Sequence, residues 1–163
     1  MKLEIKAAVE SFVDVLVQKP TKGEIGVFTL IPIPAGALIV PLLGTVSNQA
    51  SKRTIQIDDT VHLDESEHIV AGVNHSCDPN AYLDFSDLDR LCIRALEPIP
   101  EGSEVTIDYC ASEEELAEPF ECWCGSGSCY GTVRGYAFLD FEERKALDAS
   151  VSPYLQRKYQ KLM

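Results

Sequence analysis

The chain has 163 residues, of which 45% are hydrophobic and 25% are charged, and its formal net charge is −12. This length and composition are typical of one globular domain and too small for two ordinary ones. The negative charge argues against binding nucleic acid through its phosphates, which requires basic patches; it agrees with a basic partner, and equally with a role in solubility alone.

The sequence also bears on compartment and on cysteine chemistry. No run of residues has the length of a membrane-spanning helix, so no membrane partner is expected. Glu4 and Glu10 interrupt what would be the apolar core of a signal peptide, so no secretion signal is expected. Six cysteines in such a chain favour free thiols or metal ligands over disulfides, and an intracellular protein is predicted.

The first two thirds of the chain predict a short opening helix at residues 1–11 and then a series of short strands. Alternating and β-branched residues place these strands at 12–18, 25–30, 37–46, 54–58, 61–64, 81–85, 90–96 and 104–109. Pro41 and Gly44 interrupt residues 37–46, which predict either an irregular strand pair or a bent edge strand. Many short strands without intervening helices exclude a doubly wound sheet.

The last third predicts helices around an irregular segment. Ser112, followed by three glutamates, predicts the N-cap of a short helix that ends at Pro119. Residues 120–131 are rich in cysteine and glycine and predict no regular structure. Residues 141–149 and 153–162 predict helices, the second with Ser152 as its N-cap. The fold is therefore predicted to be mostly β with helices at the C-terminus.

Three closely spaced cysteines in the irregular segment predict a metal site, namely Cys122, Cys124 and Cys129. Three thiolates are one ligand short of a closed structural zinc site. Cys77, in a polar loop, is the preferred fourth ligand, while Cys92 in a strand and Cys110 after one remain alternatives. A metal shared with Cys77 would hold residues 122–129 as a lid over the loop at 74–80. The other interpretation is a reduced, irregular loop without metal.

Three motifs stand in one order along the chain. Residues 74–80 read Asn-His-Ser-Cys-Asp-Pro-Asn, residues 104–109 read Glu-Val-Thr-Ile-Asp-Tyr, and residues 122–129 contain Cys-x-Cys-x4-Cys. This combination resembles the SET-domain protein lysine methyltransferases that carry a zinc-binding post-SET tail. The resemblance covers residues 12–131 and has no upstream zinc domain.

The resemblance implies a SET-type fold of several short sheets with a knot-like core and a zinc-bound C-terminal loop. In the knot, the segment at 74–80 would pass under the loop that contains the Asp-Tyr strand. The implied domains are a SET domain at 1–111, a post-SET zinc-binding segment at 112–131 and a C-terminal helical extension at 132–163. The apolar segment at 136–163 lies beyond the resemblance, and the sequence leaves open whether it packs on its own domain, covers the substrate groove or forms a homodimer contact.

The resemblance further implies S-adenosylmethionine as methyl donor. Asn74, His75 and the backbone around Gly26 would contact the donor, and Tyr109 would be the catalytic tyrosine, which also borders the donor. The implied structural zinc would join four cysteines: Cys77, Cys122, Cys124 and Cys129. From its position between two zinc ligands, Trp123 is expected either to stack on the donor's adenine or to pack on the protein.

The expected activity is protein-lysine N-methylation, on a lysine in a basic peptide such as a histone tail. A lysine amine must be neutral to attack a methyl group, and burial in an apolar channel lowers its ordinary pKa of ~10.4. The sulfonium already activates the methyl carbon, so the protein mainly aligns and desolvates the reactants. The alternatives are a non-histone substrate and an inactive SET-like module that binds peptide. A histone substrate in a eukaryote would imply a nuclear location, and otherwise a cytoplasmic one is expected.

Three positions depart from the family pattern. The usual Gly-x-Gly is here Glu24-Ile25-Gly26, and the usual Arg-Phe before residue 74 is replaced by small apolar residues, Ala71 to Val73. Ile107 stands where many members carry Phe or Tyr, which restrict how many methyl groups are added. The aliphatic side chain predicts room for di- or trimethylation.

Overall fold

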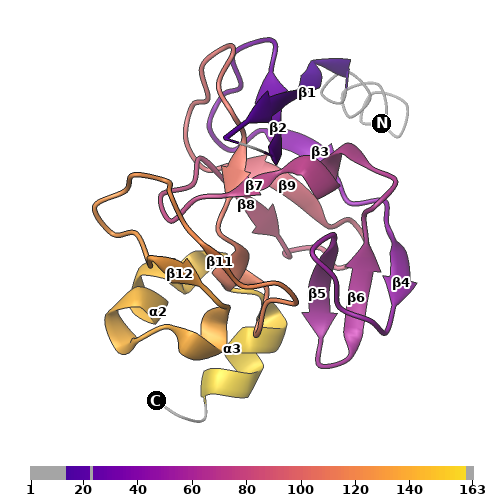
Figure 1. Ribbon diagram of the computed structural model, residues 1–163. Helices are drawn as coiled ribbons and strands as arrows, with labels where there is room; N and C mark the ends of the chain where they lie inside the picture. Colours follow the sequence, from indigo (N-terminus) through magenta and orange to yellow (C-terminus); the bar gives the residue numbers. More distant parts are fainter. Residues whose placement is uncertain (1–13, 23, 161–163) are drawn as a thin grey trace.

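The structure is a computed structural model that describes residues 14–22 and 24–160 (Figure 1). The helix predicted at 1–11 lies outside the described residues. Within them the strands are β1 (Leu16–Thr21), β2 (Glu24–Thr29), β3 (Leu38–Pro41), β4 (Thr45–Ser47), β5 (Thr54–Asp58), β6 (Val61–Asp64), β7 (Asn74–His75), β8 (Ala81–Asp84), β9 (Cys92–Ala95), β10 (Thr106–Ile107), β11 (Phe120–Glu121) and β12 (Thr132–Val133).

The helices in the same part of the chain are short. They are the 3-10 helices η1 (Ile69–Gly72), η2 (Tyr109–Ala111), η3 (Tyr136–Phe138) and η4 (Asp148–Ser150), and the α-helices α2 (Phe141–Leu147) and α3 (Pro153–Tyr159). Ser152 caps α3 as predicted, since its side chain accepts a hydrogen bond from the Leu155 amide. None of the helices in the described ranges is long and apolar enough to cross a membrane.

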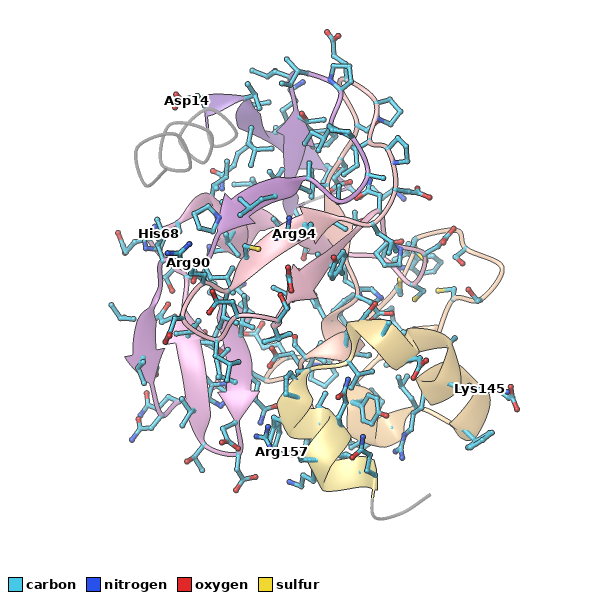
Figure 2. All side chains as sticks on the ribbon, turned by 180° about the vertical axis from the view of Figure 1, so that it is seen from behind. Asp14, His68, Arg90, Arg94, Lys145 and Arg157 are labelled. Carbon is cyan, nitrogen blue, oxygen red and sulfur yellow. The ribbon has the colours of Figure 1, made fainter. Side chains whose placement is uncertain are left out.

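The strands form small separate sheets, as the prediction of a mostly β SET-type fold requires. β1 pairs with β2, β9 lies between β3 and β8, β6 lies between β4 and β5, and β11 pairs with β12, all antiparallel. β7 and β10 pair in parallel. Arg94 of β9, labelled in Figure 2, donates a hydrogen bond to Asp84 of β8 (2.8 Å) and ties the central sheet together on its surface.

The apolar side chains form two clusters. The first lies among the strands from Leu16 to Ile107, and the second lies between residues 110 and 155. Tyr109 packs against both clusters. In Figure 1 the second cluster corresponds to the orange and yellow part of the chain, which lies against the end of the sheets. Leu155 is completely buried there, so α3 packs on its own chain.

Three predicted elements differ from the structure. Within the described residues, the strand predicted at 12–18 is β1, which begins at Leu16 and continues through Pro20 to Thr21. The strand predicted at 104–109 is reduced to β10, because Tyr109 already begins η2. The helix predicted after Ser112 is absent, because carbonyls needed for it are used elsewhere: Glu113 O accepts from the Tyr136 amide (2.9 Å) and Glu114 O accepts from the Ala137 amide (3.0 Å). Long-range pairing with the C-terminal segment therefore overrides the local capping signal.

Candidate active site

An open cleft with a volume of about 1060 Å³ runs between the β1–β2 hairpin, η1 and the cysteine-rich loop. Six of the predicted site residues line it, namely Asn74, His75, Tyr109, Cys122, Trp123 and Cys124. Among the described residues that line the cleft, none lies beyond Cys124. The C-terminal helices therefore support the cleft from behind and do not form its wall.

The parallel pairing of β7 and β10 brings two of the sequence motifs together. Asn74 lies opposite Thr106 and His75 lies opposite Ile107, and the Ser76 amide donates to Ile107 O (2.9 Å). Residues 32 positions apart thus become neighbours at the cleft. This is the close approach expected for the two segments of a knot-like core, although the threading itself stays a prediction.

Asn74 is held by two hydrogen bonds at the edge of the cleft. Its Nδ2 donates to Ile25 O (3.1 Å) and to Glu104 Oε1 (2.9 Å). Gly26 does not line the cleft; a Cβ at this position would lie 2.3 Å from Glu104 Oε1. The adjacent Ile25 does line the cleft, so donor contact by the backbone around Gly26 stays a prediction. Glycine at this position also leaves space for the carboxylate that orients Asn74.

His75 is used inside the protein. Its side chain is 1% exposed, its Nδ1 accepts from the Tyr109 amide (3.1 Å), and its Nε2 lies 3.2 Å from Cys77 Sγ. Burial lowers the pKa of His75 to about 4, so the ring is neutral at physiological pH. Because both nitrogens have partners, the backbone of His75 is the part left to contact a ligand.

Tyr109 lies between the two apolar clusters with its hydroxyl fixed. The hydroxyl donates to Val73 O (2.7 Å), and the ring contacts His75 and Phe120 (ring centroids 5.4 and 6.1 Å apart). Burial, and then the charges of nearby glutamates, raise the pKa of Tyr109 well above its ordinary value. The phenol therefore keeps its proton, and its oxygen retains acceptor capacity toward the cleft. Ile107, the position expected to set methylation state, is 4% exposed and lines the same cleft.

Asp108 belongs to a sequence motif but was not predicted as a site residue. Its Oδ2 accepts from the Tyr130 hydroxyl (2.7 Å) and its Oδ1 from the Cys110 amide (2.9 Å). Burial raises its pKa to about 6, although these two hydrogen bonds act in the opposite direction. Asp108 thus fastens the cysteine-rich tail to the strand end that carries Tyr109. A carboxylate with a partner 22 residues away gives no signal in the sequence.

The four predicted metal ligands come together, with Cys77 as the fourth member. Their Sγ atoms all lie within 4.8 Å of one another, and Cys77 Sγ is 3.8 Å from Cys122 Sγ. A tetrahedral site with Zn–S distances of about 2.3 Å has edges of about 3.8 Å, so this donor set fits zinc. Burial raises the pKa of Cys122 to about 11, while amide hydrogen bonds lower that of Cys124 to about 6 despite its burial. The alternatives Cys92 and Cys110 are buried elsewhere in the fold.

Trp123 belongs to this loop and lines the cleft. Its side chain is 79% exposed, and its carbonyl accepts a hydrogen bond from Lys22 Nζ in the β1–β2 hairpin (3.1 Å). The ring therefore has no packing role in the described protein. The exposed indole and Ile25, which is 56% exposed, line the same cleft, and each presents an apolar surface to a ligand there.

Glu113, which the sequence reasoning did not single out, also lines the cleft. Its amide donates to Tyr109 O (2.9 Å), and its Oε1 accepts from the Gln56 amide (2.8 Å) and the Ser112 hydroxyl (3.2 Å). Burial raises its pKa to about 7, against the effect of these hydrogen bonds. A carboxyl group that titrates near neutral pH in a cleft is typical of a functional site.

Comparisons with known proteins agree with this arrangement. Residues 24–110 match the SET domain family. The chain is 32% identical over 110 residues to Methyltransferase flvH of Aspergillus flavus, covering 66% of this chain and 60% of that protein. It is 31% identical over 130 residues to Histone-lysine N-methyltransferase ash1 of Drosophila melanogaster, covering 68% of this chain and 6% of that protein. The matched part of the chain thus spans 60% of the length of flvH and 6% of the length of ash1.

A similar fold is found in the crystal structure of KRYPTONITE in complex with mCHG DNA and SAH. The TM-score is 0.58 at 23% identity, over 69% of this chain and 27% of that one. The family match covers more than half of the chain, and it ends one residue after Tyr109. The chain belongs to the SET domain family.

Proposed function

We propose that this chain is an S-adenosylmethionine-dependent protein-lysine N-methyltransferase. The observation that carries the proposal is the fixed Tyr109 hydroxyl, which lies on the Val73 carbonyl in the cleft where Asn74 and Trp123 also lie. Relatives such as ash1 carry this activity in their names. The substrate is proposed to be a lysine in a basic peptide such as a histone tail, in accord with the net charge of −12.

In this mechanism S-adenosylmethionine would supply an activated methyl group, and the protein would align the reactants and exclude water from them. Asn74, the His75 backbone, Tyr109 and Trp123 would border the donor. The Val73 carbonyl and the Tyr109 oxygen would orient the incoming amine by hydrogen bonding. The apolar wall that includes Ile107 would favour the neutral amine over the ammonium. Its lack of a hydroxyl leaves space for more than one methyl group.

Zinc is proposed to join the four clustered cysteines and to act structurally. It would fix the segment at 112–131 over the cleft, beside a SET domain at 1–111, while the extension at 132–163 packs behind. Because the donor set is four thiolates, the site would be closed to substrate, as in structural zinc sites. A nuclear location would follow from a histone substrate.

The test is methyl transfer from labelled S-adenosylmethionine to core histones and to bulk cell protein, with wild type beside Tyr109→Phe. Donor binding and zinc content are measured in both. Label in one histone band that vanishes in the variant would support the enzyme and the histone substrate. Label confined to other proteins would support the non-histone alternative, which the name of flvH, silent on substrate, also leaves open. Failure to bind donor or transfer label, with zinc present, would indicate an inactive peptide-binding module.

A further inference from the structure

The lining of the cleft carries an excess of negative charge. Seven glutamates and three lysines or arginines line it among the described residues, and the histidines that line it carry no charge in the count. A cleft with one dominant sign of charge concentrates ligands of the opposite sign. The excess alone does not identify a binding residue, so the partners of the individual carboxylates decide the question.

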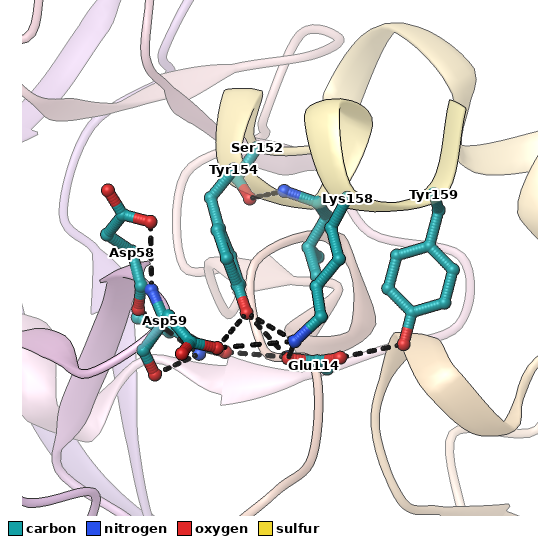
Figure 3. Close-up of polar contacts among 9 residues, drawn as sticks. Asp58, Asp59, Glu114, Ser152, Tyr154, Lys158 and Tyr159 are labelled. Carbon is teal, nitrogen blue, oxygen red and sulfur yellow. Dashed lines mark hydrogen bonds and ion pairs between the residues drawn. The ribbon is translucent and has the colours of Figure 1, made fainter. Parts of the chain in front are cut away.

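Glu113 and Glu114 are adjacent carboxylates with opposite surroundings. Both oxygens of Glu114 are occupied: Oε2 accepts from Tyr154 and Lys158 (2.7 and 2.8 Å), and Oε1 accepts from Tyr159 (2.8 Å). Figure 3 shows these three side chains of α3 converging on Glu114, with Asp59 beside them. Bonds from this group outweigh burial and lower the pKa of Glu114. Glu114 is therefore a structural anchor for the C-terminal helix.

Glu113 is instead held by hydrogen bonds to one oxygen only, and the residue lines the cleft. The Gln56 amide and the Ser112 hydroxyl both bond to Oε1, while Oε2 has no hydrogen-bond partner in residues 14–22 and 24–160. The Gln56 side chain fixes the same segment by accepting from the Glu114 amide (2.8 Å). The position of Glu113 is thus set by β5 and, through Glu114, by α3.

A second carboxylate of the cleft is also incompletely paired. Glu65 is 1% exposed, and its Oε1 accepts from the Gly44 amide (2.7 Å). Its Oε2 is buried and has no hydrogen-bond partner within the described residues. Buried carboxylate oxygens are costly to leave unpaired, so this oxygen requires a donor that the described residues do not supply.

We infer that Glu113 binds a positively charged side chain of the substrate inside the cleft, which Glu65 also lines. The bound group is an ammonium or guanidinium, which donates several hydrogen bonds and carries a positive charge opposite to that of the cleft lining. The inference rests on the proposed function in that it assigns a substrate contact to the same cleft. The Glu113 amide bonds to Tyr109 O, four residues earlier, so the bound cation would lie close to the reacting amine or would be that amine before it loses its proton.

The test measures the affinity of the zinc-loaded full chain and its variants for a set of fluorescein-labelled peptides. The parent peptide has twelve residues, with one lysine flanked by two arginines. One derivative replaces the lysine with norleucine, a second replaces the arginines with glutamine, and a third carries both changes. The variant is Glu113→Gln, whose amide oxygen still accepts from the Gln56 amide. The control is Glu115→Gln, which removes one exposed charge outside the cleft lining.

Glu113→Gln should weaken binding of the parent about tenfold, the effect of losing a charged hydrogen bond, and Glu115→Gln less than twofold. Glu113→Gln should no longer change the affinity for the derivative that lacks the cation contacted by Glu113. The derivative that shows this loss identifies the contacted residue as the lysine or an arginine. The inference is overturned if Glu113→Gln leaves parent binding unchanged or weakens all four peptides equally. If the variant does not fold, wild type alone decides: equal affinity for the parent and the doubly neutral peptide would reject it.

Methyl transfer to the parent peptide is measured in parallel, so the two proposals fail separately. If Glu113→Gln weakens binding as expected but no methyl group is transferred, the methyltransferase is rejected for this peptide and the cation site is kept. If methyl groups are transferred but Glu113→Gln leaves peptide binding unchanged, the cation site is rejected and the methyltransferase is kept.

Discussion

The raised pKa of Glu113 makes a quantitative prediction about folding stability. In the folded chain the carboxyl has a pKa of about 7, above its ordinary value of 4.5, because it is withdrawn from water. The folded state therefore holds a proton that the unfolded state releases between about pH 4.5 and pH 7. The unfolded state binds fewer protons in this window, so stability falls as pH rises through it, and the full cost is present above pH 7.

The size of the effect follows from the shift. A difference of about 2.5 pKa units corresponds to roughly 3 kcal/mol at 1.36 kcal/mol per unit, and partial exposure to the cleft reduces this to about 2 kcal/mol between pH 5 and pH 8. Glu113→Gln removes the titrating group and keeps the acceptor for the Gln56 amide. The variant should therefore gain about 2 kcal/mol relative to wild type on going from pH 5 to pH 8.

The assay is urea unfolding with saturating zinc at pH 5, 6, 7 and 8, with Glu115→Gln as the matched control for charge. Comparison between variants at each pH cancels the titration of the cysteine cluster, which all of them share. A constant difference between Glu113→Gln and wild type across this range would refute the argument that burial raises the pKa of Glu113. A rise of the same size in Glu115→Gln would assign the effect to net charge.

Three further predictions concern other parts of the chain. Gly26→Ala should displace the Glu104 carboxylate, since the added Cβ would lie 2.3 Å from it. The variant should lose about 1–3 kcal/mol of stability and should bind S-adenosylhomocysteine more weakly in calorimetry. An unchanged melting temperature would contradict this prediction. Leu155→Ala should cost about 2–5 kcal/mol in urea unfolding because the side chain is fully buried, whereas Leu88→Ala, at a residue 64% exposed, should change stability by less than about 0.5 kcal/mol. A strong chelator, or Cys124→Ser, should reduce bound zinc measured by atomic emission and lower the melting temperature; an identical melt with and without metal would remove the structural role of the cluster.

The regular elements were predictable where local patterns decide them. Residues 54–58 and 61–64 alternate polar and apolar side chains, and both form strands with the predicted bounds. Ser152 and Pro153 marked the start of α3 because capping depends on neighbours a few residues away. The helix predicted after Ser112 was wrong for the converse reason. Its capping signal is local, but its carbonyls bond to residues more than twenty positions away.

The candidate site was predictable in its motif residues and not in their supports. Cys77, Asn74 and Tyr109 were chosen from motifs and lie around one cleft or one cluster of thiols. Glu113 and Glu65 were not chosen, since single glutamates in an acidic chain are ordinarily solvated. What distinguishes them is burial and pairing with distant backbone, as in the bond from the Gln56 amide, 57 residues away. Such pairing follows from the fold and has no local pattern.

The contacts between the cysteine cluster and Tyr109 explain how a metal outside the reaction could still affect it. The Tyr109 amide donates to His75 Nδ1, so the proton of the neutral ring must be on Nε2, which lies 3.2 Å from Cys77 Sγ. A metal-bound thiolate at Cys77 is a better acceptor for that proton than a thiol, and it therefore favours the tautomer that Tyr109 requires. Metal binding would thus stabilise the backbone at the start of η2, two residues before the buried Ala111. The hydroxyl bond to Val73 fixes the other end of the tyrosine, so the cluster and the cleft share one rigid side chain.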